Sequence, residues 1–114
     1  MTEVLVKSVD QAMINVYAEA SGDRNPIHID PEFARSARFG GTIAHGMLIL
    51  AFVQEALVSK LGHDALQGRR LSTRFKAPVR SGDTVTVDVA YDKDYRIKCS
   101  NQNGEVVLVG NLKR

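Results

Sequence analysis

Residues 21–30, with the sequence SGDRNPIHID, set a histidine between two aspartates. A carboxylate and an imidazole in one turn can share a water molecule and move a proton, because imidazole titrates near neutral pH. The same residue types also start helices, and an aspartate directly before a proline, as in Asp30-Pro31, is typical of a helix N-terminus. We therefore assign Asp30 a capping role. Asp23 and His28 are either an acid–base pair or a capping acid and a turn histidine.

The tripeptide HID at 28–30 also matches half of an iron site that is built from two histidines and a carboxylate. Such a site needs a further histidine far downstream on a β-scaffold. Only His45 and His63 follow, at the two ends of a helix expected over 43–61 and before most of the predicted strands. We therefore predict no metal site and no cofactor.

The sequence also offers main-chain N–H groups as possible hydrogen-bond donors to a ligand. Gly40-Gly41-Thr42 announces the helix over 43–61, and Gly46 falls in its first turn. Helix N-termini carry unpaired N–H groups and a partial positive charge, and glycine lets a ligand approach them closely. Gly46 is thus a candidate donor to a developing oxyanion, or alternatively a site of close packing between the helix and a loop.

The interior of this helix is apolar on every side over residues 47–53. A helix of that kind must be surrounded by protein. The run is far shorter than the roughly 20 residues that span a bilayer, and residues 1–10 lack the basic-then-apolar order of a signal peptide. We therefore expect a soluble, cytoplasmic protein with no membrane partner.

Period-two alternation and turn signals dominate the second half of the chain. Strands are predicted over 71–77, 84–91, 96–101 and 105–112, and a short strand and a helix precede them over 4–6 and between Asp10 and Gly22. The dipeptide Asn103-Gly104 predicts a type I′ hairpin. The second half therefore reads as an antiparallel meander.

A chain of 114 residues fits one domain, 1–114, and its 44% apolar and 25% charged composition is that of a globular protein. The predicted class is α+β, with a long buried central helix wrapped by a curved antiparallel sheet of about five strands. Such a sheet leaves an edge and part of a face open, which a second copy covers most simply. A homodimer follows as an expectation.

Charge and cysteine content narrow the partners. The net charge is +2, and a basic cluster gathers Arg69, Arg70, Arg74, Lys76 and Arg80. The cluster is either a solvated strand face or a rim that attracts a phosphorylated ligand. Only one aromatic residue interleaves with these charges, which argues against nucleic acid. Cys99, the sole cysteine, forms no internal disulfide and is expected to be an inert thiol in a strand.

The segments SGDRNPIHIDPEFA and FGGTIAHGML, in this order, resemble the MaoC-like family of (R)-specific enoyl-CoA hydratases and dehydratases. The resemblance covers nearly the whole chain and is most specific over 21–48. It implies a single MaoC-like hot-dog domain, assembled as a homodimer or a dimer of dimers. It also implies hydration of a trans-2-enoyl-CoA to an (R)-3-hydroxyacyl-CoA, or the reverse dehydration.

By this resemblance Asp23 and His28 hold and activate the water, and the N–H near Gly46 forms the oxyanion hole. Substrate-binding positions implied by the same match are Asn25, His45, Met47 and Arg74. From the residues alone, Asn25 can instead order the turn through its amide, and His45 can pack or cap the helix.

Other functions are compatible with the same fold pattern. The carrier can be acyl carrier protein, which would make the chain a dehydratase subunit, or the domain can bind acyl groups without catalysis. Thioesterase action is less favoured, because Glu55 is the sole candidate carboxylate on the central helix and lies at its polar end. Two departures from the family pattern are Thr42, expected to loosen the helix entry in place of a proline, and Gln54, which leaves the acyl chain length open.

Overall fold

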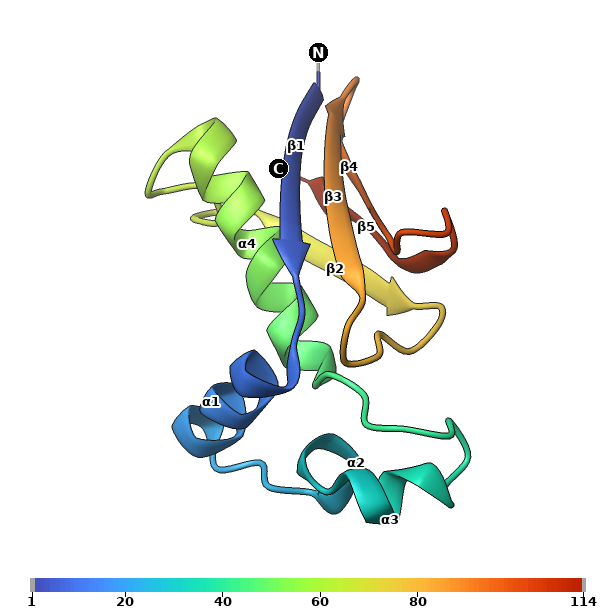
Figure 1. Cartoon of the computed structure of the whole chain (residues 1–114). Helices are drawn as coiled ribbons and strands as arrows, with labels where there is room; N and C mark the ends of the chain where they lie inside the picture. The colour runs from blue at the N-terminus through green and yellow to red at the C-terminus, as the bar shows by residue number, and fades with distance from the viewer. Residues whose placement is uncertain (1, 114) are drawn as a thin grey trace.

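The computed structural model describes residues 2–113 and contains five strands and four helices within them (Figure 1). In chain order they are β1 (Thr2–Ser8), α1 (Gln11–Ser21), α2 (Pro26–Ile29), α3 (Pro31–Arg35), α4 (Gly46–Leu61), β2 (Arg70–Phe75), β3 (Thr84–Tyr91), β4 (Tyr95–Ser100) and β5 (Val106–Lys113). The predicted α+β class is confirmed. None of the helices in this described part of the chain is long and apolar enough to span a membrane.

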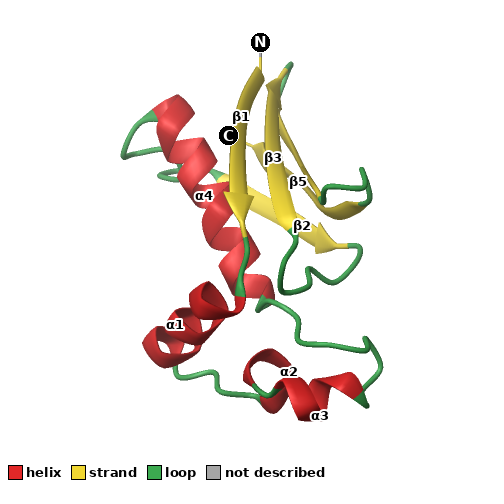
Figure 2. Ribbon diagram, viewed as in Figure 1, coloured by secondary structure: helices red, strands yellow, loops and turns green. Residues whose placement is uncertain are grey.

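The strands form one antiparallel sheet in the order β1-β3-β4-β5-β2. Strands β3, β4 and β5 are a meander, but β2 pairs with β5 and the N-terminal β1 pairs with β3, so the expectation of a meander through the whole second half is wrong. The chain therefore crosses the sheet between β2 and β3, and the two edges are β1 and β2. Figure 2 shows α4 lying along one face of the sheet, with α1, α2 and α3 grouped beyond its N-terminal end.

The core lies between α4 and the sheet. Val85, Val87 and Val89 alternate inward along β3 and are fully buried, as the period of a strand dictates. The residues that α4 buries are Leu48, Ile49, Phe52, Val53, Ala56 and Leu57. Met47 on the same helix is 61% exposed and Ala51 is also exposed, so within one chain α4 is covered on one side rather than all round.

Helix α4 begins three residues later than its apolar pattern predicts. Ile43 forms an isolated antiparallel bridge with Arg80, and the Ala44 N–H donates to the Val79 carbonyl at 2.7 Å. These contacts hold the chain extended up to Gly46, where the helix can start. The extended stretch brings the segment before α4 alongside the loop that follows β2.

Local capping explains the small helices. The Asp30 carboxylate accepts from the N–H groups of Glu32 and Phe33 and is followed by Pro31 at the first helical position, so its predicted capping role is confirmed. Asn25-Pro26 repeats this arrangement and starts α2, a single turn that the sequence pattern did not predict. Asp10 likewise caps α1, and Gly22 ends it at φ 79°.

The hairpin between β4 and β5 differs from its prediction. A type I′ turn needs a positive φ at both central residues, and Gly104, at φ 78°, is in that region whereas Asn103 is not. The Gly104 N–H donates to the Asn101 carbonyl, and the register shifts between Cys99 and Ser100. The dipeptide therefore marks the hairpin correctly and its turn type wrongly.

Candidate active site

The loop between α1 and α2 carries the candidate carboxylate. It is ordered by side-chain hydrogen bonds between residues two positions apart. Ser21 Oγ accepts from the Asp23 N–H, Asp23 Oδ1 accepts from the Asn25 N–H, and Asn25 Oδ1 accepts from the Ile27 N–H. Each is a local turn in which a side chain replaces a main-chain acceptor. Asn25 thus orders the turn that separates Asp23 from His28.

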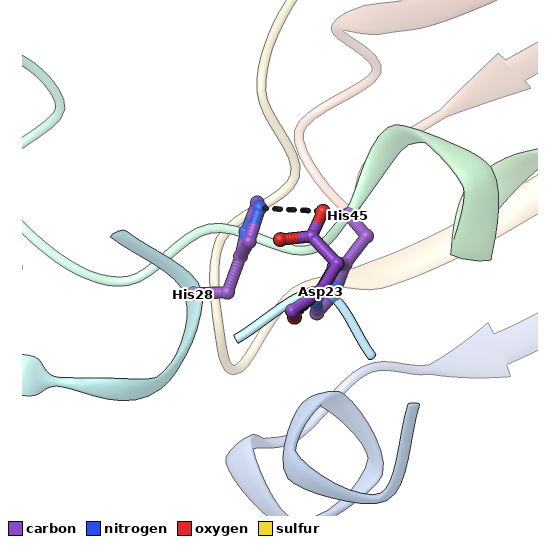
Figure 3. A group of neighbouring side chains, drawn as sticks. All are labelled: Asp23, His28 and His45. Atoms are coloured by element: carbon purple, nitrogen blue, oxygen red, sulfur yellow. Dashed lines mark hydrogen bonds and ion pairs between the residues drawn. The ribbon is translucent and has the colours of Figure 1, made fainter. Parts of the chain in front are cut away.

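His28 is fixed by its other ring nitrogen. Its Nδ1 lies 2.7 Å from the Ile43 carbonyl, which can only accept, so Nδ1 carries the hydrogen. In the neutral ring Nε2 then has a free lone pair, and it lies 3.9 Å from Asp23 Oδ2. Figure 3 shows the carboxylate turned toward the ring, with the dashed line joining these two atoms. The His28 side chain is 12% exposed and that of Asp23 is 54% exposed, so the pair opens to solvent on the carboxylate side.

The gap between these two atoms suits a shared water molecule. A separation of 3.9 Å is too long for a direct hydrogen bond. A water oxygen about 2.8 Å from each atom fits across it, because such a bridge satisfies both acceptors at ordinary hydrogen-bond lengths. The structure therefore brings the side chains of Asp23 and His28 within reach of one water molecule.

His45 lies directly behind this pair. It is 2% exposed, its Nε2 lies 2.8 Å from the Asp23 carbonyl, and its ring stacks on His28 with centroids 3.8 Å apart and planes 23° apart. Tyr17 of α1 packs edge-on against the His45 ring, with ring centroids 4.9 Å apart. His45 also precedes Gly46 as the N-cap residue of α4. It therefore contacts both members of the pair and the helix tip.

A further contact to His28, which the sequence did not indicate, comes from Gln11 of α1. Gln11 Nε2 donates to the His28 carbonyl at 2.8 Å, and Thr42 Oγ1 donates to Gln11 Oε1 at 2.6 Å. Thr42 is buried. The expectation that Thr42 loosens the entry to α4 is therefore wrong. Its hydroxyl holds that entry against α1 through Gln11, and Gln11 in turn holds the main chain of His28.

An apolar cavity of about 370 Å³ opens beside the tip of α4. Its wall is formed by Arg38, Phe39, Ile43, Ala44, Gly46, Ile49, Phe75, Lys76, Ala77, Pro78, Val79 and Val107. Gly46 lies here against the Phe75 ring, where an added Cβ would come within 3.1 Å of Cζ. Among residues 2–113 no side chain caps the first turn of α4, so the N–H of Gly46, a residue of the cavity wall, has no side-chain acceptor.

The remaining predicted substrate contacts lie outside the cavity wall. Met47 and Arg74 are exposed on α4 and β2, whereas Phe75 and Lys76, which follow Arg74, form part of the wall. Arg38, together with Lys76, supplies the positive charge there. The sequence pattern singled out Lys76 within the basic cluster but gave no reason to choose Arg38.

Asp23, His28 and His45 each offer one metal-ligand atom, and these atoms lie within 4.8 Å of one another. A metal bound by two imidazoles must lie about 2.1 Å from each nitrogen and in both ring planes. The rings of His28 and His45 are stacked, so their planes share no point near both nitrogens. The alternative pair of His28 with Asp30 is also disfavoured, because the Asp30 carboxylate caps α3. The donor set therefore fits an acid–base pair better than a metal centre.

Comparison with known proteins places this fold and site in a family. Residues 2–110 match the family model described as MaoC like domain, and the chain belongs to this family. Over 98% of its length it superimposes on 91% of the (R)-hydratase from A. caviae involved in PHA biosynthesis, with a TM-score of 0.84 and 29% identity. The predicted hot-dog fold is thereby confirmed.

Two curated relatives have names that state an activity. The chain is 35% identical over 117 residues to the 3-hydroxybutyryl-CoA dehydratase of Methylorubrum extorquens, covering 96% of this chain and 74% of that protein. It is 39% identical over 85 residues to the (R)-specific enoyl-CoA hydratase of Rhodospirillum rubrum, covering 75% of this chain. The alignment spans 59% of the length of the latter relative.

Proposed function

We propose that this chain interconverts a trans-2-enoyl-CoA and an (R)-3-hydroxyacyl-CoA by adding or removing water. The observation that carries the proposal is the 3.9 Å gap between Asp23 Oδ2 and His28 Nε2. His28 is held by the carbonyl of Ile43, which, like Gly46 at the uncapped tip of α4, belongs to the wall of the apolar cavity. The names of the relatives support the same pair of reactions and the thioester substrate.

The chemistry of hydration follows from these positions. A water held between the two side chains attacks C3 of the enoyl thioester and gives one proton to the pair. The pair returns one proton to C2, so it ends in its starting protonation state while one water is added. Acid–base groups of this kind supply a rate factor of about 10²–10⁴. Dehydration is the same path reversed.

Gly46 provides the third element of this mechanism. As electrons move toward the thioester carbonyl, its oxygen gains negative charge, and preorganised N–H donors stabilise it. The Gly46 N–H is at the first position of α4, where helix geometry leaves it without an intrahelical partner. The adjoining cavity is apolar apart from Arg38 and Lys76, which suits an acyl chain with a phosphorylated carrier at the rim.

The proposal is tested by substituting the pair. Asp23→Asn and His28→Gln should each lower kcat for crotonyl-CoA hydration, followed by loss of enoyl absorbance, by about 10²–10⁴-fold, with an unchanged free energy of unfolding. His63→Gln is the matched control, since His63 is exposed beyond the far end of α4. Full activity in both variants would contradict the assignment.

A homodimer is part of the same proposal. Strand β2 is a sheet edge, and exposed Phe75 at its end lies beside Gly46 and near exposed Met47 on α4. A second copy that covers this edge would remove these apolar side chains from water. Light scattering at micromolar concentration should give twice the chain mass for the wild type and a reduced mass for Phe75→Glu, and a monomeric wild type would overturn it.

A further inference from the structure

The buried ring of His45 contacts both residues of the proposed acid–base pair. We infer that His45 is a positioning residue, which sets the distance and orientation between Asp23 and His28, rather than a substrate-binding residue. The inference rests on the proposed function for its kinetic consequences. Its geometric basis is independent of that function.

The first contact holds the main chain of Asp23, the residue that carries the carboxylate. Because the Asp23 carbonyl can only accept, His45 Nε2 carries the hydrogen and donates to it at 2.8 Å. Asp23 itself is exposed, and the other hydrogen bonds of its loop are short-range turns. The bond from His45 is therefore what ties this loop to the N-terminus of α4.

The second contact acts on the imidazole. The stacked ring of His45 closes one face of His28, while the Ile43 carbonyl holds its Nδ1. Rotation of the His28 ring out of this plane would break both contacts. Tyr17 packs edge-on against His45 and limits the movement of His45 in turn.

A role in binding substrate directly does not fit these observations. His45 is 2% exposed, its Nε2 is engaged by the Asp23 carbonyl, and one face of its ring lies against His28. Its Nδ1 is buried without a hydrogen-bond partner among the described residues. Retaining such a group in a core position is costly, which is understandable if Nε2 and the ring face are both needed.

Three substitutions separate the two contacts. His45→Phe keeps the stacked ring and loses the donor, His45→Gln keeps an N–H donor and loses the ring, and His45→Leu loses both. We expect kcat to fall about 10-fold for each of the first two and about 100-fold for His45→Leu, with KM within about twofold of the wild type, because small displacements of reacting groups cost rate. His63→Leu, at an exposed histidine, is the matched control.

Double-mutant cycles distinguish positioning from general destabilisation. In an Asp23→Asn background, His45→Phe should lower kcat by less than about threefold, because the carboxylate it positions has lost its chemistry. His45→Gln should likewise have little effect in a His28→Gln background. Full additivity in both cycles, or a raised KM with unchanged kcat, would overturn the inference.

An NMR readout tests the geometry without any catalysis. Ring current from His45 should shift the His28 Hε1 resonance, and the shift should disappear in His45→Gln and His45→Leu but remain in His45→Phe. A His28 resonance that does not move in any of the three would contradict the stacked arrangement. Lack of enoyl-CoA turnover in the wild type would instead contradict the proposed function and leave this NMR result to decide on His45.

Discussion

The turn formed by residues 21–30 and the core between α4 and the sheet are stabilised by different interactions. Residues 21–30 bury no side chain completely and are ordered by side-chain oxygens that accept main-chain N–H groups. The core of α4 and β3 instead depends on fully buried apolar side chains such as Leu57 and Val87. Under the proposed function, activity and stability depend on separate residues, so substitutions should affect them separately.

The largest expected effect on stability lies in the core. Leu57→Ala removes a fully buried side chain from α4 and should lower the free energy of unfolding by about 2–5 kcal/mol. Urea denaturation measures this loss. The Asp23→Asn variant is the comparison, and a loss of similar size there would break the separation between the two regions.

A smaller effect on stability is expected from the Asp30 cap at the start of α3. Asp30→Ala removes the acceptor for two N–H groups at the start of α3 and should cost about 0.5–2 kcal/mol. Because His28 is held separately by Ile43 and Gln11, kcat should change by less than about threefold. Asp30→Asn, which keeps the acceptor oxygen, is the matched control, and equal losses in the two variants would contradict a capping role.

The smallest effect concerns the buried thiol and appears only in alkali. Burial raises the pKa of Cys99 to about 12, from 9.0 for a free thiol, so the folded state keeps a proton that the unfolded state loses above pH 9.0. Stability from this group is complete below pH 9.0 and declines as pH rises toward 12. At pH 9.5 the free energy of unfolding of the wild type should be lower than at pH 7.5 by on the order of 1 kcal/mol through this group.

Cys99→Ala isolates this titration. It removes the thiol at every pH, so the difference between the two proteins in free energy of unfolding should narrow from pH 7.5 to 9.5. Urea curves at the two pH values measure it. Parallel pH dependence in wild type and variant would show that the thiol does not titrate abnormally.

Several local features of the fold were predictable from the sequence, although α2 and the turn type of the β4–β5 hairpin were not, and the long-range strand pairing was not. Alternating valines fixed the bounds of β3, and Asp10 and Asp30 marked helix starts, because strand period and capping act over a few residues. The pairing of β2 with β5 left no local pattern, because it depends on where the chain crosses the sheet.

The same division holds for the site. The residue types and spacing of Asp23 and His28 suggested a pair, and family resemblance chose between the catalytic and the capping interpretation. The contact between Gln11 and Thr42 joins residues 31 positions apart, and nothing in the spacing of a glutamine and a threonine indicates it. Nothing in the sequence likewise indicates that the ring of His45 stacks on that of His28.

Under the proposed function, Ile43 connects substrate preference with catalysis through two different parts of one residue. It borders the cavity, yet it holds His28 through its main-chain carbonyl, an atom that every amino acid possesses. Larger or smaller side chains at position 43 could therefore resize the acyl compartment without removing the histidine's anchor. Under the proposed function, substitutions at position 43 would change the preferred length of the acyl chain while Asp23 and His28 stay in place.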